Sequence, residues 1–371
     1  MAPALKRRLA ALLVLILGAS GAALGTGTPA PAAPAPGAVV AATAATLPPE
    51  LAGLATGKRI EYVTTNLSGA TITATGLVLT PKTGRTNRTV VWGHGTTGLA
   101  DKCTPSVSQA VFWPEARQAI AALLGKGWTV TAPDFPGLGT DQAHPYLVGG
   151  SEGRSIIDSV KAARNLDRAL STQYAVDGHS QGGQGALFAG ELAPAYDGTL
   201  VLKGVAAIAP ASNLDLIAPS IPGTPGQGYY PMALQGIKAI EPDFDPNDYL
   251  AAPARAVSSV LRTGCLYEIL DQYAALTAEE LVPGGVVSPD VQRRLARYGN
   301  PATAPSSAPI LIVQGTADEA VPYDVTAYVL LDQLAQYSQP VRFVPVDGAN
   351  HDESVFATTG LVADWIASRF S

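Results

Sequence analysis

A serine flanked by glycines lies at residues 178–182, where the chain reads Gly178-His179-Ser180-Gln181-Gly182. A short strand-like segment, residues 174–177, precedes this motif, and a small-residue helix start follows at residues 183–189. A serine on a sharp strand-to-helix turn has its Oγ exposed, and glycines on either side let the backbones crowd together. The positive end of the helix then points at the reacting centre. The pattern therefore predicts that Ser180 is a catalytic nucleophile.

The same spacing occurs a second time, at Gly149-Gly150-Ser151-Glu152-Gly153, in a different setting. Pro145 lies shortly before it, and no buried strand leads into it. The residues that follow have a capping-box-like spacing and open a helix with apolar residues on one face over 155–170. We therefore interpret Ser151 as a loop or helix-entry residue.

A serine hydroxyl needs a base to take its proton, and that base is usually a histidine oriented by a carboxylate. Folds that carry the nucleophile on such a turn keep the chain order serine, acid, histidine. Of the four histidines, only His351 lies after Ser180, in a loop that follows the strand-like residues 342–346. We predict that His351 is the base, the alternative being a solvent-facing loop histidine, and that His179 packs beside the nucleophile.

The acid is expected after the buried strand-like residues 310–313, where the chain reads Gly315-Thr316-Ala317-Asp318-Glu319. Asp318 is favoured because a Gly-x-x-Asp spacing after the strand recurs in folds of this kind. Glu319 is the competing carboxylate. Asp324 and Asp215 are more remote alternatives.

The oxyanion of a tetrahedral intermediate needs preorganised N–H donors. One donor is expected from Gln181, the residue after the nucleophile, and a second from the loop after a preceding strand. That loop reads Gly93-His94-Gly95-Thr96-Thr97-Gly98. Thr96 is the predicted second donor and Thr97 the alternative. The competing interpretation is that the glycines only form a tight turn and that the loop has no such role.

Apolar, β-branched segments alternate with helical stretches, which predicts an α/β fold with a mostly parallel, eight-stranded sheet flanked by helices. Catalytic groups in such sheets lie beyond the carboxyl ends of the strands. The expected helices cover residues 115–126, 155–170 and 184–192. The expected strands cover residues 60–64, 71–80, 89–92, 129–132, 174–177, 205–208, 310–313 and 342–346.

The alternation stops between residues 211 and 308, a stretch too long for a structureless loop in a compact domain. We interpret it as a mostly helical cap inserted between the sixth and seventh core strands. Helical decoration with no role over the site is the alternative. The core then comprises residues 50–210 and 309–371.

Residues 1–28 have the layout of a signal peptide, in which basic residues at 6–8 precede an apolar run at 9–17 and small residues follow. A membrane anchor is the alternative, but the apolar run is shorter than the roughly 20 residues of a membrane span. Residues 29–49 are uncharged and rich in Ala and Pro, which predicts an extended linker.

The chain is acidic, with a formal net charge of -6 that becomes -9 once Lys6, Arg7 and Arg8 leave with the signal peptide. This balance argues against nucleic acid and anionic membranes as partners. The two cysteines, Cys103 and Cys265, are expected to pair, because a secreted chain with an even number of cysteines usually joins them. We expect a secreted monomer without stable membrane insertion.

Taken together, these motifs resemble α/β-hydrolases of the secretory lipase family, in the form found in actinobacteria. The resemblance runs from about residue 50 to the C-terminus and is weak across the cap. It implies a secreted triacylglycerol lipase or carboxylesterase with a helical cap over an acyl pocket. Several fungal members have a disulfide-supported cap, which fits the Cys103 and Cys265 pair. The motifs that carry the resemblance are residues 93–98 with Cys103, 134–140, 178–183, 315–318 and 350–351.

The expected reaction is ester hydrolysis through an acyl-enzyme, with a small-molecule or lipid ester as substrate. Ser180 attacks the carbonyl carbon, His351 moves the proton, and Asp318 orients the imidazole. Gln181 and Thr96 hold the oxyanion. No metal or organic cofactor is expected, because too few His and Cys remain for a zinc site beside this set.

A secreted peptidase or amidase on the same scaffold is the main alternative, since cap carboxylates could bind a substrate amine. A non-catalytic binding domain is a third possibility, which the three filled triad positions disfavour. The cap carboxylates in question are Glu241, Asp243, Asp245, Asp248, Glu279 and Glu280.

Overall fold

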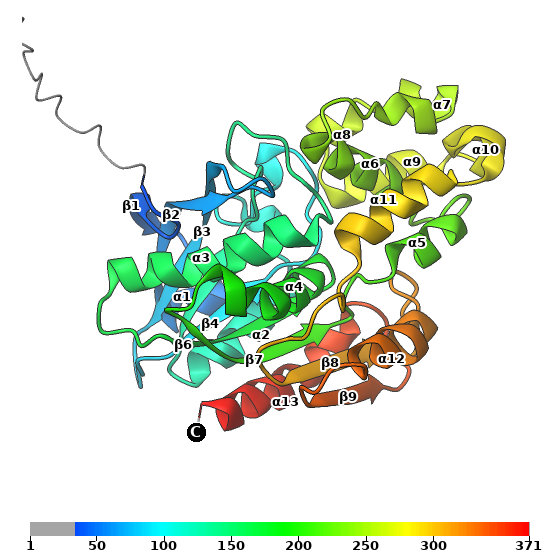
Figure 1. Ribbon diagram of the computed structural model, residues 1–371. Coiled ribbons are helices and arrows are strands. Elements are labelled where there is room, and N and C mark those ends of the chain that lie inside the picture. The colour runs from blue at the N-terminus through cyan, green and yellow to red at the C-terminus, as the bar shows by residue number, and fades with distance from the viewer. Residues whose placement is uncertain (1–33, 371) are drawn as a thin grey trace, which may run out of the picture. The chain divides into compact units, whose positions relative to one another are not determined.

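The computed structural model describes residues 34–370, which are built around one nine-stranded sheet (Figure 1). The strand order is β1-β2-β3-β5-β4-β6-β7-β8-β9. Neighbours from β5 through β4 to β9 are parallel, whereas β1, β2, β3 and β5 pair antiparallel. The strands are β1 (Val39–Ala45), β2 (Ala55–Thr65), β3 (Thr71–Pro81), β4 (Thr89–Gly93), β5 (Thr129–Pro133), β6 (Gln173–His179), β7 (Val201–Ile208), β8 (Ile310–Gly315) and β9 (Val341–Val346).

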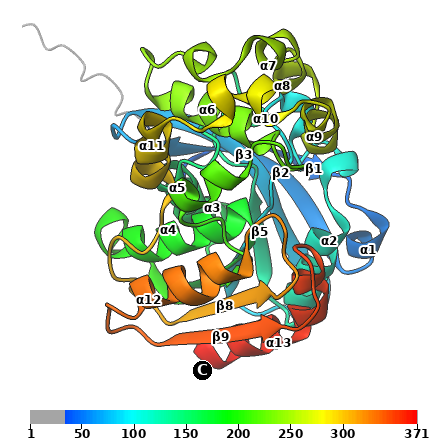
Figure 2. The same ribbon diagram turned by 90° about the vertical axis from the view of Figure 1, so that its right-hand side faces the viewer.

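Helices cover both faces of the sheet (Figures 1 and 2). Helices α2 (Pro114–Gly125) and α13 (Glu353–Arg369) pack on one face, and α3 (Gly149–Leu166) and α4 (Gln181–Tyr196) pack on the other. Because side chains alternate along a strand, Val90 and Trp92 of β4 join the first cluster while Val91 joins the second. Strands buried on both faces read as continuous apolar runs, which is why the sequence revealed them.

The predicted α/β architecture is confirmed, and each of the eight expected strands is present. The ninth, β1, lies inside residues 29–49, which the sequence predicted to be a linker. Its small residues are mostly exposed, so they give little hydrophobic signal, and the strand exists through its antiparallel pairing with β2. The short helix α1 (Pro49–Ala52) follows it. The predicted signal peptide, residues 1–28, lies outside the described residues.

Helix α3 begins earlier than the sequence predicted, so that the second glycine-serine-glycine match forms its first turn. Glycines there allow close packing: a Cβ on Gly149 would lie 2.0 Å from the ring of Phe188 in α4, and one on Gly153 would lie 2.9 Å from the amide of Ala189. Packing against α4 therefore outweighs the low helix propensity of glycine. Ser151 is buried in this turn, with no strand before it.

The segment between β7 and β8 is helical, as expected, and contributes no strand to the sheet. Its side chains form a hydrophobic cluster of their own, which also includes Tyr146 of the core. No helix in the described part of the chain is long and apolar enough to cross a membrane. The helices of this segment, hereafter the cap, are α5 (Leu214–Ile217), α6 (Tyr229–Ile240), α7 (Ala252–Ala256), α8 (Val260–Thr263), α9 (Leu266–Ala274), α10 (Ala278–Leu281) and α11 (Pro289–Gly299).

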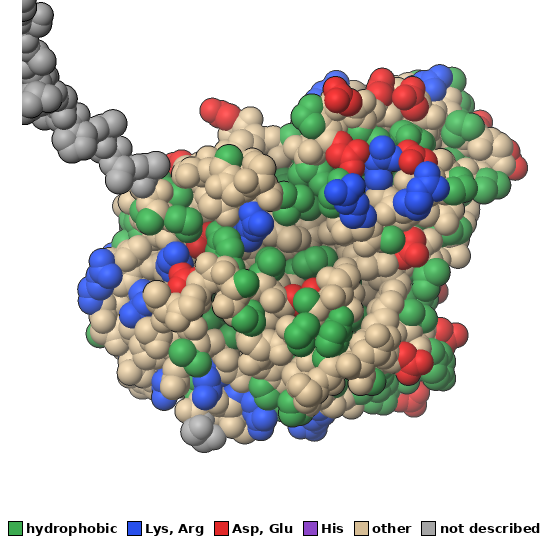
Figure 3. Space-filling view, viewed as in Figure 1, with side chains coloured by type: hydrophobic (Ala, Val, Ile, Leu, Met, Phe, Trp, Pro, Cys, Tyr) green, Lys and Arg blue, Asp and Glu red, His purple; other side chains and the backbone are tan. Residues whose placement is uncertain are grey.

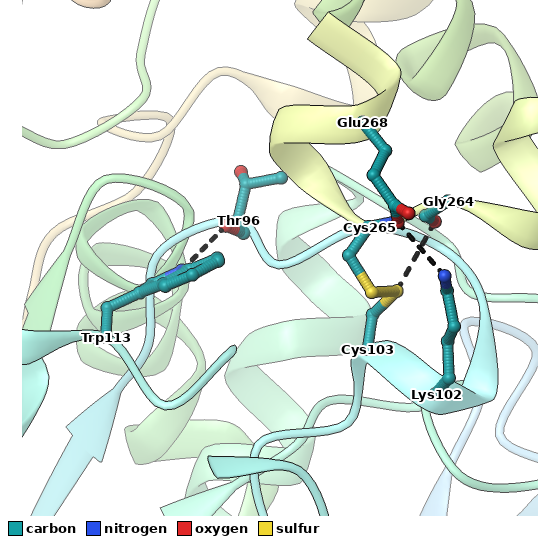
Figure 4. The surroundings of a disulfide bond; sticks show 7 residues. All are labelled: Thr96, Lys102, Cys103, Trp113, Gly264, Cys265 and Glu268. Carbon is teal, nitrogen blue, oxygen red and sulfur yellow. Dashed lines mark hydrogen bonds and ion pairs between the residues drawn. A yellow bond between two sulfur atoms is a disulfide. The ribbon is translucent and has the colours of Figure 1, made fainter. Parts of the chain in front are cut away.

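A disulfide bond joins the cap to the loop after β4 (Figure 4). Cys103 and Cys265 have their Cα atoms 5.5 Å apart and are 162 residues apart in sequence. Beside the bond, the amide of Leu266 donates a 2.9 Å hydrogen bond to the carbonyl of Thr97. The pairing predicted from the sequence is thus present, and it fixes the start of α9 against the loop that follows β4.

Removing the disulfide should destabilise the fold. Chain-entropy models assign a closed loop of 162 residues a stabilisation of up to about 5 kcal/mol. We expect the double variant Cys103→Ala/Cys265→Ala to unfold at a lower urea concentration than the oxidised protein. Adding a reductant should lower the midpoint of the wild type and leave the variant unchanged. Alkylation of both cysteines in unreduced, denatured wild type would contradict the bond.

Candidate active site

Ser180 lies on a strained turn between β6 and α4. Its backbone has φ 56° and ψ -116°, a region that a residue with a Cβ occupies at a cost of about 1–3 kcal/mol. Two hydrogen bonds hold the turn: the amide of Ser180 donates to the carbonyl of Ile208 at 2.9 Å, and the amide of Ala211 donates to the carbonyl of Ser180 at 3.1 Å. The side chain is partly exposed. The turn thus presents the Ser180 hydroxyl at the carboxyl end of the sheet.

Glycines let the ends of β4 and β6 touch the first turn of α4. A Cβ on Gly182 would lie 2.0 Å from the carbonyl oxygen of Gly93, and one on Gly178 would lie 2.2 Å from the carbonyl oxygen of Gly182. No real Cβ fits at such distances. The serine turn therefore requires glycine at these positions, as its sequence pattern predicted.

The carboxylate of Asp318 and the imidazole of His351 meet at the ends of the neighbouring strands β8 and β9. Nδ1 of His351 donates to Oδ2 of Asp318 at 2.8 Å. Oδ1 of Asp318 accepts the amides of Ala320 and Val321, both at 2.9 Å, and Oδ2 also accepts Nε2 of Gln314 at 2.8 Å. These donors fix the carboxylate, which in turn fixes the tautomer of His351 with Nε2 as its free acceptor.

The competing carboxylates are placed elsewhere. Glu319 and Asp324 are exposed. Asp215 accepts a 2.6 Å hydrogen bond from Nδ2 of Asn300 in the cap. Of the four candidates, the structure brings Asp318 to His351.

His179 connects this pair to the serine turn. Its ring lies 4.5 Å from the ring of His351, centroid to centroid, and its Nε2 donates to the carbonyl of His351 at 3.2 Å. His179 therefore packs beside the site, as expected. Within the described residues, Oγ of Ser180 makes no hydrogen bond, which leaves its proton uncommitted; such catalytic contacts often tighten only when substrate is bound.

Charges around His351 favour its protonated form. Burial lowers the pKa of the imidazole, but the hydrogen bond and charge of Asp318, together with the charges of Asp352 and Glu115, outweigh this effect and raise it. Burial raises the pKa of Glu115 itself to about 7. Burial and the nearby His351 instead hold the pKa of His179 well below its usual range. His351 is thus the more basic of the two adjacent histidines.

The loop after β4 lies against the serine turn. A Cβ on Gly95 would be 3.7 Å from the Cβ of Ser180. Thr96 is buried and held from two sides: its Oγ1 lies 2.8 Å from the hydroxyl of Tyr146, and its carbonyl accepts Nε1 of Trp113 at 3.1 Å (Figure 4). Because β4 is flanked by β5 on one side and β6 on the other, this loop lies at the switch point of the sheet, where α/β folds bind ligands.

Gln181 follows Ser180 as the first residue of α4, and Thr96 follows Gly95, the loop residue that lies against Ser180. Backbone N–H groups in a first helical turn have no acceptor within the helix. Thr97, the alternative donor, is buried, and its carbonyl is bonded to the cap. The assignment of Gln181 and Thr96 as oxyanion donors stays a prediction.

Sequence reasoning did not identify the residues that hold the predicted set in place. Trp113 and Tyr146 support Thr96, and Gln314 supports Asp318. Gln314 had a usable signal, since it is the one polar side chain in the otherwise apolar strand β8. Trp113 and Tyr146 had none, because their partners lie 17 and 50 residues away in the chain.

A cavity of about 460 Å³ opens between the cap and the loop after Asp318. Mostly apolar side chains line it, and the core contributes residues one to four positions beyond Asp318. An apolar cavity beside a polar set is the usual form of a small-molecule site. Its lining residues are Ile217, Ser220, Ile221, Thr224, Pro225, Gly226, Tyr229, Leu270, Glu319, Ala320 and Pro322.

Among the described residues, one group of side chains has the spacing of metal ligands. His179, His351 and Asp352 offer ligand atoms within 4.8 Å of one another. The hydrogen bonds of His179 to the His351 carbonyl and of His351 to Asp318 already use one nitrogen of each ring. We therefore assign these residues to the serine site, and the absence of a metal stays a prediction.

Solved structures share this fold over most of the chain. Candida antarctica lipase A in its closed state matches with a TM-score of 0.73 at 19% identity, covering 85% of this chain and 78% of that one. The rice cell wall degrading esterase LipA from Xanthomonas oryzae matches with a TM-score of 0.73 at 21% identity, covering 91% and 100%. At these identities the likeness establishes the fold alone, which is that of the α/β-hydrolases.

The chain belongs to the secretory lipase family, because residues 111–371 match the sequence profile of that family. A secreted triacylglycerol lipase of Malassezia globosa is 26% identical over 332 residues, which cover 84% of this chain and 70% of the relative. Lipase 10 of Candida albicans is 26% identical over 278 residues, 68% of this chain and 57% of the relative. The family resemblance inferred from the motifs is confirmed.

Replacing Gly182 by alanine should disrupt the serine turn. The added Cβ would meet backbone atoms of Gly93, which cannot move aside, so we expect a loss of about 3 kcal/mol or more in the free energy of unfolding. Gly360 in α13 is the matched control, since a Cβ there meets no atom within 4 Å. Gly360→Ala should be neutral or stabilising by up to about 1 kcal/mol. Urea unfolding measures both, and equal stabilities would contradict the proposed contact.

The pKa of His351 should set the acid limit of Ser180 reactivity. Protonated imidazole cannot take a proton, so labelling of Ser180 by a fluorophosphonate should slow as the pH falls through the raised pKa, above the ordinary histidine value of about 6.5. Asp318→Asn should move the midpoint to lower pH and lower the plateau rate. Glu319→Gln is the matched control and should leave the midpoint unchanged. A midpoint that moves in Glu319→Gln and stays unchanged in Asp318→Asn would assign the acid to Glu319.

Proposed function

We propose that this protein is a secreted serine hydrolase that cleaves carboxylic esters through an acyl-enzyme intermediate. The observation that carries the proposal is the strained turn of Ser180 beside the hydrogen-bonded pair of His351 and Asp318, at the ends of β6, β9 and β8. Membership in the secretory lipase family supports the same activity. Secretion is supported by the predicted signal peptide and by the disulfide bond, which is typical of oxidising compartments.

The geometry supports a two-step reaction. Oγ of Ser180 attacks the ester carbonyl carbon while Nε2 of His351 takes its proton, and the carbonyl oxygen becomes an oxyanion near the amides of Gln181 and Thr96. Collapse of this intermediate breaks the bond to the alcohol, which leaves with the proton from His351. Water then attacks the acyl-enzyme with the same base, releasing the acid and restoring Ser180.

The substrate class follows from the cavity beside Asp318. Its lining is mostly apolar and its volume of about 460 Å³ suits a hydrocarbon chain, so we assign it to the acyl group of the ester. Burial of each methylene contributes about 0.8 kcal/mol, which favours longer acyl chains until the cavity is filled. The relative from Malassezia globosa is named a secreted triacylglycerol lipase, which supports lipid esters as substrates here.

Amide hydrolysis, the second candidate, has less support because three of the six cap carboxylates considered for it, Glu241, Asp245 and Glu280, have hydrogen-bond partners within the cap. Glu241 accepts hydrogen bonds from Arg294 and Tyr298, and Asp290 pairs with Arg294 as well. Figure 3 shows acidic and basic side chains gathered side by side on this face of the cap. Glu280 caps its own helix through the amide of Thr277. These carboxylates therefore have structural partners, which makes a role in binding a substrate amine less favourable.

Ser180→Ala should remove nearly all turnover, a loss of several powers of ten, with the fold intact. A fluorophosphonate should label the wild type at one residue, Ser180, which peptide mass spectrometry identifies. Ser151→Ala is the matched control from the second glycine-serine-glycine match and should keep both labelling and turnover. Labelling at Ser151 would refute the assignment.

A series of p-nitrophenyl esters and matched anilides tests the substrate class. We expect ester hydrolysis to exceed anilide hydrolysis at every acyl length, and kcat/KM for esters to rise with acyl length from acetyl towards medium chains as the cavity fills. Comparable rates on anilides would favour the amidase. A preference for acetyl esters would contradict the assignment of the apolar cavity.

A further inference from the structure

Glu152 comes from the second glycine-serine-glycine match and lies against the first turn of α4. It is fully buried, and its Oε1 accepts a 2.8 Å hydrogen bond from Nε2 of Gln181. The same Nε2 lies 3.1 Å from Nε2 of His144. Both hydrogens of Nε2 of Gln181 are therefore accounted for only if His144 accepts at its own Nε2.

The far side of His144 determines that it does. Its Nδ1 lies 2.7 Å from the carbonyl oxygen of Pro136. Because a carbonyl oxygen only accepts hydrogen bonds, Nδ1 of His144 carries the hydrogen and Nε2 is left as an acceptor. The two hydrogens of the Gln181 amide group then go to His144 and Glu152. These hydrogen bonds run from the loop after β5, through α4, to α3, and Oε2 of Glu152 is buried without a hydrogen-bond partner among the described residues.

Burial favours the uncharged form of both titratable groups in this network. Burial raises the pKa of Glu152 to about 8 and lowers the pKa of His144 to about 4. Neither group then carries an unpaired charge inside the protein, where such a charge is costly. A glutamine at position 152 can replace the neutral acid with the same shape and the same acceptor oxygen.

We propose that Glu152 and His144 are positioning residues for the oxyanion hole, which act by holding the side chain of Gln181 and thereby the direction of its backbone N–H. This inference rests on the proposed function, in which that N–H is an oxyanion donor. The side chain and the N–H belong to the same residue, so anchoring the side chain on both sides limits rotation of the first turn of α4. The contact of Gly182 with Gly93 fixes the next residue.

The effect should appear in kcat and not in KM, since the oxyanion forms only on the way to the transition state. Displacing a catalytic group by about 1 Å costs on the order of a hundredfold in rate. We therefore expect Gln181→Leu to lower kcat by about tenfold to a hundredfold, with KM changed less than about twofold. The rate of fluorophosphonate labelling should fall in parallel, because the adduct places an oxygen at the same N–H groups.

Gln184→Leu is the matched control. Gln184 lies one turn further along α4, is fully buried, and donates to the carbonyls of Gly299 and Leu147 at 2.6 and 3.4 Å. Its replacement removes the same kind of group from the same helix. We expect a comparable loss of thermal stability with kcat within about twofold of the wild type.

Substitutions at the anchors separate positioning from packing. Glu152→Ala should lower kcat by about tenfold, and Glu152→Gln should recover most of that loss because it keeps the acceptor oxygen. Thermal unfolding of each variant shows that it is folded at the assay temperature. If a leucine or alanine variant does not fold, Glu152→Gln and His144→Gln take its place, because both keep a polar side chain. The kcat and the labelling rate of these two variants then test the same proposal.

Wild-type kcat in Gln181→Leu or Glu152→Ala would overturn the proposal, as would equal losses of kcat in Gln181→Leu and Gln184→Leu. Failure of the proposed function has a different signature, seen in the wild type itself. A wild type that is labelled at Ser180 but hydrolyses no ester refutes the substrate class, and the labelling rates still test the network. A wild type that is neither labelled nor active overturns both, because it has no oxyanion hole to position.

Discussion

Direct contact between two backbones is the constraint on which this site depends. Gly182 at the start of α4 touches Gly93 at the end of β4, with no room for a Cβ between them. This contact holds a helix end, two strand ends and the loop of Thr96 within reach of one serine. It also accounts for the strained backbone of Ser180, since the chain must reverse from strand to helix within a single residue. The cost of that strain is met by the packing of a sheet that is covered on both faces.

Two buried carboxyl groups near the serine have different partners and therefore suit different tasks. Asp318 accepts hydrogen bonds from two backbone amides, a glutamine and His351, so its position is set from several directions. Glu152 accepts one side-chain hydrogen bond, from Gln181, and burial raises its pKa to about 8. The first arrangement suits a group that orients an imidazole, and the second suits a neutral anchor inside the core. Local environment, more than residue type, separates the two.

Much of the fold and the central residues of the site could be predicted because their signals are local in sequence. The strand, glycines and helix start that mark Ser180 all lie within about a dozen residues of sequence, and the buried strands appear as apolar runs. Strand β1 escaped prediction because its exposed small residues depend on pairing with β2. The start of α3 was not predicted because its glycines disfavour a helix in isolation, and only their packing against α4 accounts for them. The contacts of Gln181 with Glu152 and His144 join residues 29 and 37 positions apart, which no local pattern encodes.

The position of the disulfide also determines how the molecule responds to cleavage of its backbone. A single cut between Cys103 and Cys265 leaves two fragments that remain covalently joined. A cut beyond Cys265, for example beside the exposed Gly284, which has positive φ, does not leave the two fragments joined by the disulfide. It leaves Asp318 and His351 on a separate fragment, attached to the rest through strand pairing and side-chain packing alone. Continuity of the peptide chain through the second half of the cap is therefore what keeps Ser180 in one covalent molecule with Asp318 and His351.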